Sequence, residues 1–369
     1  MNGKAQKKVV RAWIVNFLGA VGAVLVAEIC LSFFSSEKGR IPVPVADALP
    51  AIANFSEETN KVVKVKQFSE GFGVAHFNSD GSRSTGNDLI NDAPTGLIIG
   101  DSFVEALQVD DRDTMGAVIE RTSRSELWPV NVRQFGWGGT SSATYLAIAN
   151  SVKKRWNPRW VSVLFNEDDF TEEAISGGRF WKMEIDPIDS TLRTIPVERT
   201  GSRFDSVLSK VGLTSGDLRE LLNHSNLAYL AVEKYLLSGN AGGAESSKPT
   251  AADKLQTLNK AKTIAKAVIR GLKVAYGEEL LIVYVPQISV TSSLEPDTTE
   301  SILAEVCYQE KVQFISARRA LLGLRERRGV LGEGFSNTLP GYGHLNELGH
   351  QAVGQEIWRA VSERGRNNQ

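Results

Sequence analysis

The side chain best suited to nucleophilic chemistry in this 369-residue chain is Ser102, in the segment Gly100-Asp101-Ser102-Phe103. The segment directly follows a short apolar run at 97–99 that is typical of a buried strand. A serine at such a turn can expose its hydroxyl while neighbouring backbone N–H groups point into the same space, as a nucleophile with an oxyanion site requires. Gly-Asp-Ser is also ordinary turn chemistry, so the segment alone leaves both interpretations open.

Two further segments could complete such a site. The run Gly136-Trp137-Gly138-Gly139 follows a weaker strand candidate at 131–135, and its glycines permit close backbone approach to a ligand. Its spacing matches neither common phosphate-binding glycine motif, and we predict no cofactor. His344 lies in a glycine-rich stretch before the last predicted helix and is placed to act as a base. No cysteine stands at ligand spacing to His344 or His350, and we predict no metal site.

Short apolar runs alternate with longer amphipathic stretches along most of the chain. Further strand candidates are 160–165, 280–285 and, more weakly, 312–315. Helical stretches lie between them, at 114–122, 143–155, 255–275 and 299–309, with a closing helix at 348–363. This order predicts βαβ units and a parallel, doubly wound sheet. Ligands of such folds bind outside the carboxyl ends of the strands, where Ser102, the glycine-rich loop and His344 are expected.

The composition excludes other classes of protein. Lys and Arg total 42 against 43 Asp and Glu, so the net charge is −1, and we expect no nucleic-acid partner, which would need a concentrated basic surface. Hydrophobic residues make up 42% of the chain, as in ordinary globular proteins. The two cysteines, Cys30 and Cys307, cannot form a disulfide framework or a cysteine-based zinc cluster, and we expect no disulfide between them.

The N-terminus predicts a membrane location. Residues 12–34 form an apolar stretch, interrupted by Asn16 and Glu28, that as a helix would span roughly 30 Å of hydrocarbon. The basic tail at 1–11 favours a cytoplasmic N-terminus. We therefore predict a single-pass anchor in the inner membrane, with the rest of the chain periplasmic. A cleaved signal peptide and a soluble core helix are the alternatives.

The chain beyond the anchor divides into a lead-in and a main domain. Residues 35–90 predict a stalk and a short β-rich lead-in, with a turn at 78–82. Residues 91–365 carry the strand–helix alternation. Within them, 175–250 breaks the alternation with polar loops, a helix at 218–237 and a Gly-, Ala- and Ser-rich connector, and we interpret it as an insertion over one face of the sheet.

Three segments in this order resemble the GDSL or SGNH hydrolase family over roughly residues 94–362: Gly100-Asp101-Ser102-Phe103-Val104-Glu105-Ala106-Leu107-Gln108-Val109, the 136–139 loop, and His344-Leu345-Asn346. The chain looks most similar to membrane-anchored bacterial members that act on cell-surface glycans. The resemblance implies a flavodoxin-like three-layer α/β/α sandwich, which agrees with the strand pattern. It also implies Ser102 as nucleophile and oxyanion donor, supported by Asp101. Gly139 would be a second oxyanion donor, and His344 the base.

The oxyanion asparagine of the family has no clear counterpart. It usually precedes an aspartate after the third strand, and alignment on Asp169-Phe170 puts Asp168 at its position. Asn166 is the only amide nearby. An ionised carboxylate would oppose the negative charge that develops on an oxyanion, so we favour Asn166. A protonated Asp168 or a lost donor are the alternatives.

The acid of the family's triad is also missing from its usual place. The family normally has an aspartate three residues before the histidine, where this chain has Gly341. In a serine protease, loss of the equivalent acid costs about 10⁴ in rate. Either a backbone carbonyl or a distant carboxylate holds His344, or the site is weak; Glu333 and Glu347 are near in sequence. A Ser102–His344 dyad is the working prediction.

These features predict an extracytoplasmic serine esterase that removes ester groups, notably O-acetyl, from envelope or exported glycans through an acyl-enzyme on Ser102. The expected partners are an acylated carbohydrate or other ester substrate, and the membrane. Transfer to a sugar hydroxyl instead of water would make the protein an O-acyltransferase for polysaccharide. The missing aspartate leaves a non-catalytic glycan-binding or assembly protein as a further alternative. Aromatic residues could line a sugar cleft or belong to the core: Trp137, Phe180, Trp181 and Tyr342.

Overall fold

A computed structural model of the chain describes residues 16–30, 63–66, 70–78, 80–153, 156–170, 181–185, 192–196 and 251–367. The chain forms two compact units, one of Met1–Ser36 with Arg199–Lys248 and one of Glu37–Glu198 with Pro249–Gln369. In the first unit residues 16–30 are helical, and the rest of the predicted 12–34 anchor lies outside the described residues, as does the helix predicted at 218–237. Among the described residues, no helix combines the length and the apolar character needed to cross a membrane.

The second unit is built on a parallel sheet of five strands in the order β4-β3-β5-β8-β9. The strands are β3 (Thr95–Gly100), β4 (Asn131–Gly136), β5 (Trp160–Phe165), β8 (Leu280–Tyr284) and β9 (Gln313–Ser316). Numbered within the sheet this is the order 2-1-3-4-5, as in flavodoxin-like folds. The predicted parallel, doubly wound sheet is confirmed.

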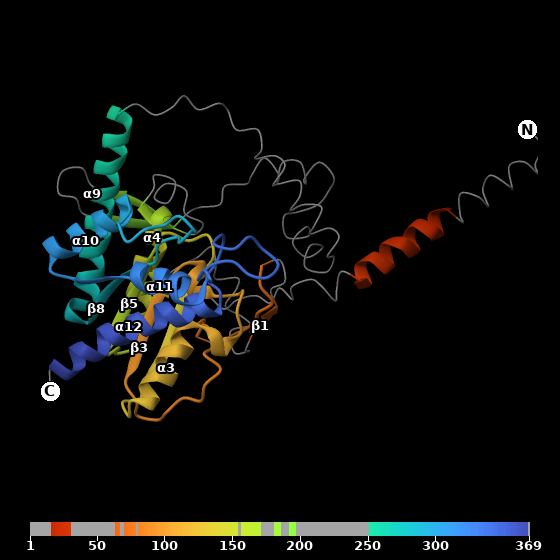
Figure 1. Cartoon of the computed structure of the whole chain (residues 1–369), viewed down its shortest axis with the longest axis horizontal. Coiled ribbons are helices and arrows are strands. Elements are labelled where there is room, and N and C mark those ends of the chain that lie inside the picture. Colours follow the sequence, from red (N-terminus) through yellow and green to blue (C-terminus); the bar gives the residue numbers. More distant parts are fainter. Residues whose placement is uncertain are drawn as a thin grey trace, which may run out of the picture. The chain divides into compact units, whose positions relative to one another are not determined.

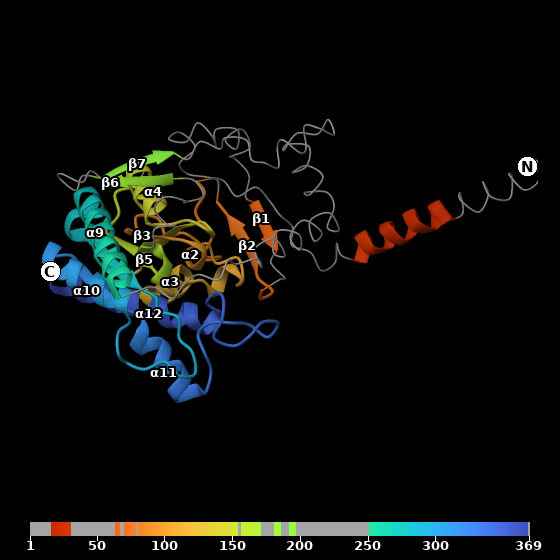
Figure 2. The same ribbon diagram turned by 90° about the horizontal axis from the view of Figure 1, so that it is seen from above.

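Helices cover both faces of this sheet and make three layers (Figure 1). One face packs against α4 (Ser142–Lys153), α9 (Ala251–Tyr276) and α10 (Thr298–Glu310), and the other against α3 (Met115–Ser125), α11 (Arg318–Arg328) and α12 (Glu347–Asn367). In Figure 2, β3 and β5 lie between α4 and α12. Side chains alternate between the two cores as strand geometry requires: Leu97 and Ile99 enter the first, and Ile98 the second.

The change of face between crossovers marks the expected ligand-binding position, here called the crevice. The helix that follows β3, α3, lies on one face, whereas α4, which follows β4, lies on the other. Strand order therefore reverses between β3 and β5, and ligands of doubly wound sheets bind at the carboxyl ends of the two strands that flank such a reversal. The segments after β3 and β5 contain Ser102 and Asn166.

Two short antiparallel pairs accompany the sheet. Strands β1 (Val63–Lys66) and β2 (Val74–Phe77) pair with each other, and the described residues of this stretch, 63–66 and 70–78, are here called the lead-in segment. The chain then passes to the sheet edge, where the N–H of Arg83 donates to the carbonyl of Gln134 on β4 at 2.8 Å. Strands β6 (Trp181–Ile185) and β7 (Leu192–Pro196) form the second pair, inside the predicted insertion.

Candidate active site

Ser102 begins a single helical turn, α2 (Ser102–Glu105), directly after β3. Asp101 caps the turn, since its Oδ1 accepts the N–H of Phe103 at 2.9 Å. Two glycines allow the turn to lie against the sheet. A Cβ at Gly136 would be 2.4 Å from the backbone nitrogen of Glu105, and one at Gly100 would be 2.6 Å from a methyl group of Val104. The half-buried Ser102 is thereby held at the carboxyl end of the sheet.

The glycine-rich loop after β4 lies beside Ser102. A Cβ added at Gly138 would be 3.7 Å from Cβ of Ser102. The N–H of Gly138 donates to Oε2 of Glu105 at 2.8 Å, so Gly139 is the remaining oxyanion candidate of this loop. Gly139 has a φ of +69°, which favours glycine. Trp137 is buried in the hydrophobic core, which agrees with the core interpretation rather than with a sugar cleft.

The side-chain amide of Asn166, the favoured oxyanion candidate, faces the start of α2. Its Nδ2 donates to Oδ2 of Asp101 at 2.7 Å, and its backbone N–H donates to Oδ2 of Asp169 at 2.9 Å. Asp169 in turn accepts the hydroxyl of Tyr145 at 2.7 Å. Burial raises the pKa of Asp101, although the N–H of Phe103, the charge of His344 and the Asn166 amide oppose the rise. The side chain of Asp168 lies outside the described part of the chain.

His344 is brought to the same edge of the sheet. Its ring meets the ring of Phe103, the neighbour of Ser102, edge to face, with centroids 5.9 Å apart and planes at 89°. The carbonyl of His344 accepts the N–H of Gly334 at 3.0 Å, which fixes the backbone of this loop. The structure therefore gathers Ser102, Asp101, Asn166 and His344 around one crevice.

The acid that contacts His344 is Glu70, which the sequence analysis did not single out. Oε2 of Glu70 lies 2.5 Å from Nδ1 of His344, and Oε1 accepts the backbone N–H of His344, also at 2.5 Å. Glu333 and Glu347 make no hydrogen bond to this ring among the described residues. The working prediction of a dyad is therefore incomplete, because the imidazole has a carboxylate partner. The two residues are 274 positions apart, and no local motif links them.

Of the other predicted aromatic residues, Phe180 and the side chain of Trp181 lie outside the described residues. Tyr342, two positions before His344, is 62% exposed and so is accessible to a ligand.

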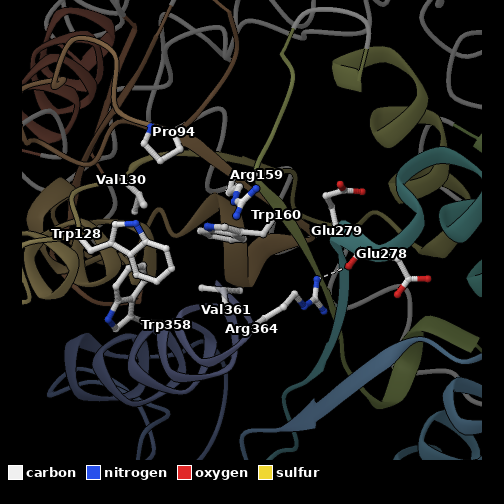
Figure 3. Close-up of a pocket in the computed structure, with 10 residues that line it drawn as sticks. All are labelled: Pro94, Trp128, Val130, Arg159, Trp160, Glu278, Glu279, Trp358, Val361 and Arg364. Carbon is white, nitrogen blue, oxygen red and sulfur yellow. Dashed lines mark hydrogen bonds between the residues drawn. The ribbon is translucent and has the colours of Figure 1, made fainter. Parts of the chain in front are cut away.

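A cavity of about 320 Å³ lies at the opposite, amino end of the sheet (Figure 3). Its walls include Trp128, Trp160 and Trp358, with Arg159 and Glu279 at its margin. It contains none of the predicted site residues. The predicted site residues that the structure describes lie instead toward the carboxyl end of the sheet.

Comparisons with known proteins give structural likeness only. No family model matches the chain, and no curated protein matches it in sequence. A psychrotrophic esterase, EstA, from Pseudoalteromonas sp. is 10% identical, over 74% of this chain and 98% of that chain, with a TM-score of 0.37. A lipase/acylhydrolase from Enterococcus faecalis is 13% identical, over 74% and 97%, with a TM-score of 0.38. The acetyl xylan esterase AlAXEase is 13% identical, over 72% and 99%, with a TM-score of 0.38. Likeness at this level assigns neither family nor activity.

Proposed function

We propose that this chain is a serine esterase that works through an acyl-enzyme on Ser102. The observation that carries the proposal is the placement of His344, whose Nδ1 lies 2.5 Å from a carboxylate and whose ring contacts Phe103, next to Ser102. An oriented imidazole beside a serine on a strand-to-helix turn is the arrangement that activates a serine nucleophile.

The reaction follows from which ring nitrogen is engaged. Because Nδ1 of His344 faces the carboxylate, Nε2 remains to take the proton of Ser102 as its Oγ attacks the ester carbonyl carbon. The resulting oxyanion would accept hydrogen bonds from the N–H groups of Ser102 and Gly139 and from the amide of Asn166. The bond to the alcohol then breaks, and His344 returns its proton to that alcohol.

The acyl-enzyme is resolved by a second attack on the same carbonyl. Water gives its proton to His344, adds to the carbonyl carbon and displaces Ser102, which recovers the proton; a carboxylic acid is released. A sugar hydroxyl in place of water would give a transferred ester, so an O-acyltransferase uses the same site. Partition between added sugar acceptors and water, followed by mass analysis of the products, separates the two activities.

O-acetyl esters of envelope or exported glycans are the proposed substrates. The sequence resemblance to glycan-active hydrolases supports this choice, as does the exposed Tyr342 beside His344, since an aromatic face can stack on a sugar ring. Release of acetate from acetylated glycans, compared with release from long-chain esters, tests it. A preference for long acyl chains would contradict it.

We further propose that residues 12–34 anchor the protein in the inner membrane with the esterase unit in the periplasm. The apolar stretch and the basic residues before it support this location. The expected result is a protein that leaves the membrane fraction in detergent but not in high salt, and that added protease degrades in spheroplasts. Recovery in the soluble fraction would favour a cleaved signal peptide.

The decisive test is reaction of the full-length chain with a fluorophosphonate, followed by intact mass. Stoichiometric labelling that Ser102→Ala abolishes and His344→Ala slows is expected. A folded wild-type protein that takes up no label would contradict the esterase and favour the non-catalytic glycan-binding alternative.

A further inference from the structure

The carboxylate of Glu70 makes both of its described hydrogen bonds to a single residue. One oxygen accepts the backbone N–H of His344 and the other faces Nδ1 of its ring, each at 2.5 Å. The side chains are 18% and 27% exposed, so this pair is only partly screened by water. Gly343 makes room for the contact: a Cβ there would be 2.1 Å from Oε1 of Glu70. The loop is therefore shaped around this carboxylate.

The electrostatics of the pair favour an ionised acid. Burial by itself would raise the pKa of Glu70, but the hydrogen bonds from the ring and backbone of His344, with the charge of that ring, lower it below its ordinary value. Glu70 is therefore negatively charged at neutral pH. A charge at this position stabilises the imidazolium that forms when His344 takes a proton.

The position three residues before His344 cannot supply the acid. Gly341 has a φ of +77°, which L side chains rarely adopt. A Cβ there would be 2.8 Å from a methyl group of Leu331 and 3.2 Å from the carbonyl oxygen of Ile288. An aspartate at 341 would be both strained and crowded, so a carboxylate for His344 has to come from another segment.

Next to Glu70, the lead-in segment is hydrogen-bonded to and packed against the rest of the second unit. Gly71 and Asn337 exchange two hydrogen bonds, with Gly71 N–H donating at 3.0 Å and the Asn337 amide at 3.2 Å. A Cβ at Gly71 would be 2.4 Å from the carbonyl oxygen of Gln108, so the two backbones are in close contact. These contacts hold the residue that follows Glu70 between Asn337 and Gln108.

Strand β2 donates backbone hydrogen bonds to two neighbouring aspartates. The N–H of Val74 donates to Asp110 at 2.7 Å, and the N–H of His76 donates to Asp111 at 2.9 Å. The ring of His76 also bonds Asp111, at 2.7 Å. Asp111 forms an ion pair with Arg83, which is 1% exposed. The strand that follows Glu70 is thus held by an aspartate that is also paired with a buried arginine.

We propose that Glu70 is the positioning residue of His344, and that the lead-in segment is for this reason part of the active site. Glu70 keeps the proton of the neutral ring on Nδ1, which leaves Nε2 free to take the proton of Ser102, and it stabilises the charged ring. The inference rests on the proposed serine chemistry. The proposal goes further in one respect: catalysis requires that the lead-in segment, which is outside the five-stranded sheet, be packed against the unit that holds Ser102 and His344.

The test compares full-length variants in fluorophosphonate labelling and in kcat and KM for a chromogenic acetyl ester. Glu70→Gln is expected to lower kcat about 10²–10⁴-fold, as loss of a triad acid does elsewhere, with KM nearly unchanged because Glu70 does not touch the substrate. The matched control is Glu347→Gln, which removes an exposed carboxylate from the same region and should label at the wild-type rate. Asn337→Ala removes a contact of the lead-in segment but keeps the carboxylate. Its kcat and labelling rate should lie between those of Glu70→Gln and Glu347→Gln.

A proton NMR spectrum separates a positioning role of Glu70 from a purely structural one, because it reports the hydrogen bond at Nδ1 of His344 directly. Wild type and Glu347→Gln are expected to show a far-downfield proton resonance from Nδ1 of His344, and Glu70→Ala is expected to lose it while its melting temperature stays close to the wild-type value. Wild-type labelling that Glu70→Gln does not slow would overturn the role of Glu70 and leave the serine esterase standing. Absence of the resonance from folded wild type would also overturn it. Failure of wild type to label would instead refute the esterase itself.

Discussion

The side-chain amide of Asn166 donates a 2.7 Å hydrogen bond to Asp101, the residue before the candidate nucleophile. This bond joins the carboxyl ends of β5 and β3, the two strands between which the sheet order reverses. It holds the Asn166 amide beside Ser102 and, since an amide nitrogen has two hydrogens, uses one of them. Asp101 therefore supports the site by orienting residues on both sides of the crevice.

Substitution of Asn166 is expected to slow the reaction more than substitution of Asp168. Asn166→Ala removes an oxyanion donor and should lower kcat about 10²–10³-fold. Asp168→Asn, a change two residues further along the same segment, should stay within about threefold of wild type, since the proposed donor, Asn166, is left in place. Steady-state kinetics on an acetyl ester measures both. A gain in kcat with Asp168→Asn would assign the oxyanion position to residue 168, because an amide donates where an ionised carboxylate opposes the developing charge.

Substitution of Gly341 should cost stability for two separable reasons. Gly329 also has a positive φ, +67°, but no atom lies within 4 Å of a Cβ there, so Gly329→Ala reports the conformational cost alone, about 1 kcal/mol. Gly341→Ala adds the clash with Leu331 and should cost about 1–3 kcal/mol more in the free energy of unfolding. Urea denaturation of both variants checks the difference. Equal losses would show that position 341 has room for a side chain, and so for an aspartate.

Much of the fold could be predicted because its central strands are continuous apolar runs. Strands β3, β5 and β8 are buried on both faces, and such runs stand out between polar turns. Helix α11 was not predicted, because its buried leucines are interrupted by Gly323 and flanked by arginines, which obscures the helical period.

The site could be predicted only as far as local motifs reach. Ser102, the glycine-rich loop and His344 each lie in a short segment whose residues suit the chemistry. Glu70 has no such signal, since its role depends on the docking of a segment 274 residues away in sequence. Gly341 is the one indirect indication of Glu70: because the usual acidic position near His344 is a glycine, a carboxylate partner for His344 must come from a distant segment.

A buried acid on the histidine loop should make stability depend on pH. Burial and the nearby charge of Glu167 raise the pKa of Glu333 from 4.5 to about 8, although the Ile288 backbone N–H opposes the rise. The folded protein thus keeps a proton that the unfolded chain releases, and the free energy of unfolding should fall as pH rises through this window, by about 1.4 kcal/mol per unit at the steepest. Glu333→Gln removes this pH dependence. The free energy of unfolding of the variant should therefore rise relative to that of wild type between about pH 5 and about pH 8.

Urea denaturation at the two pH values gives this difference directly. Glu347→Gln is the control, because Glu347 is an exposed carboxyl at the start of α12, directly after this loop, and the variant should show no such gain. A stability gap between Glu333→Gln and wild type that stays constant with pH would show that Glu333 is ionised in the folded protein.

Loss of the ion pair beneath the lead-in segment should affect both stability and catalysis. Asp111→Asn leaves the buried guanidinium of Arg83 without its anion, and removal of one partner of a buried pair typically costs about 3–5 kcal/mol. The double variant Arg83→Met with Asp111→Leu should recover much of that loss, since an apolar pair carries no unpaired charge. It still lacks the Asp111 carboxylate that accepts the hydrogen bonds of the His76 backbone and ring, so strand β2 should dock less firmly and labelling of Ser102 should remain slow. Recovery of stability together with a full labelling rate would show that Glu70 reaches His344 without the help of Asp111.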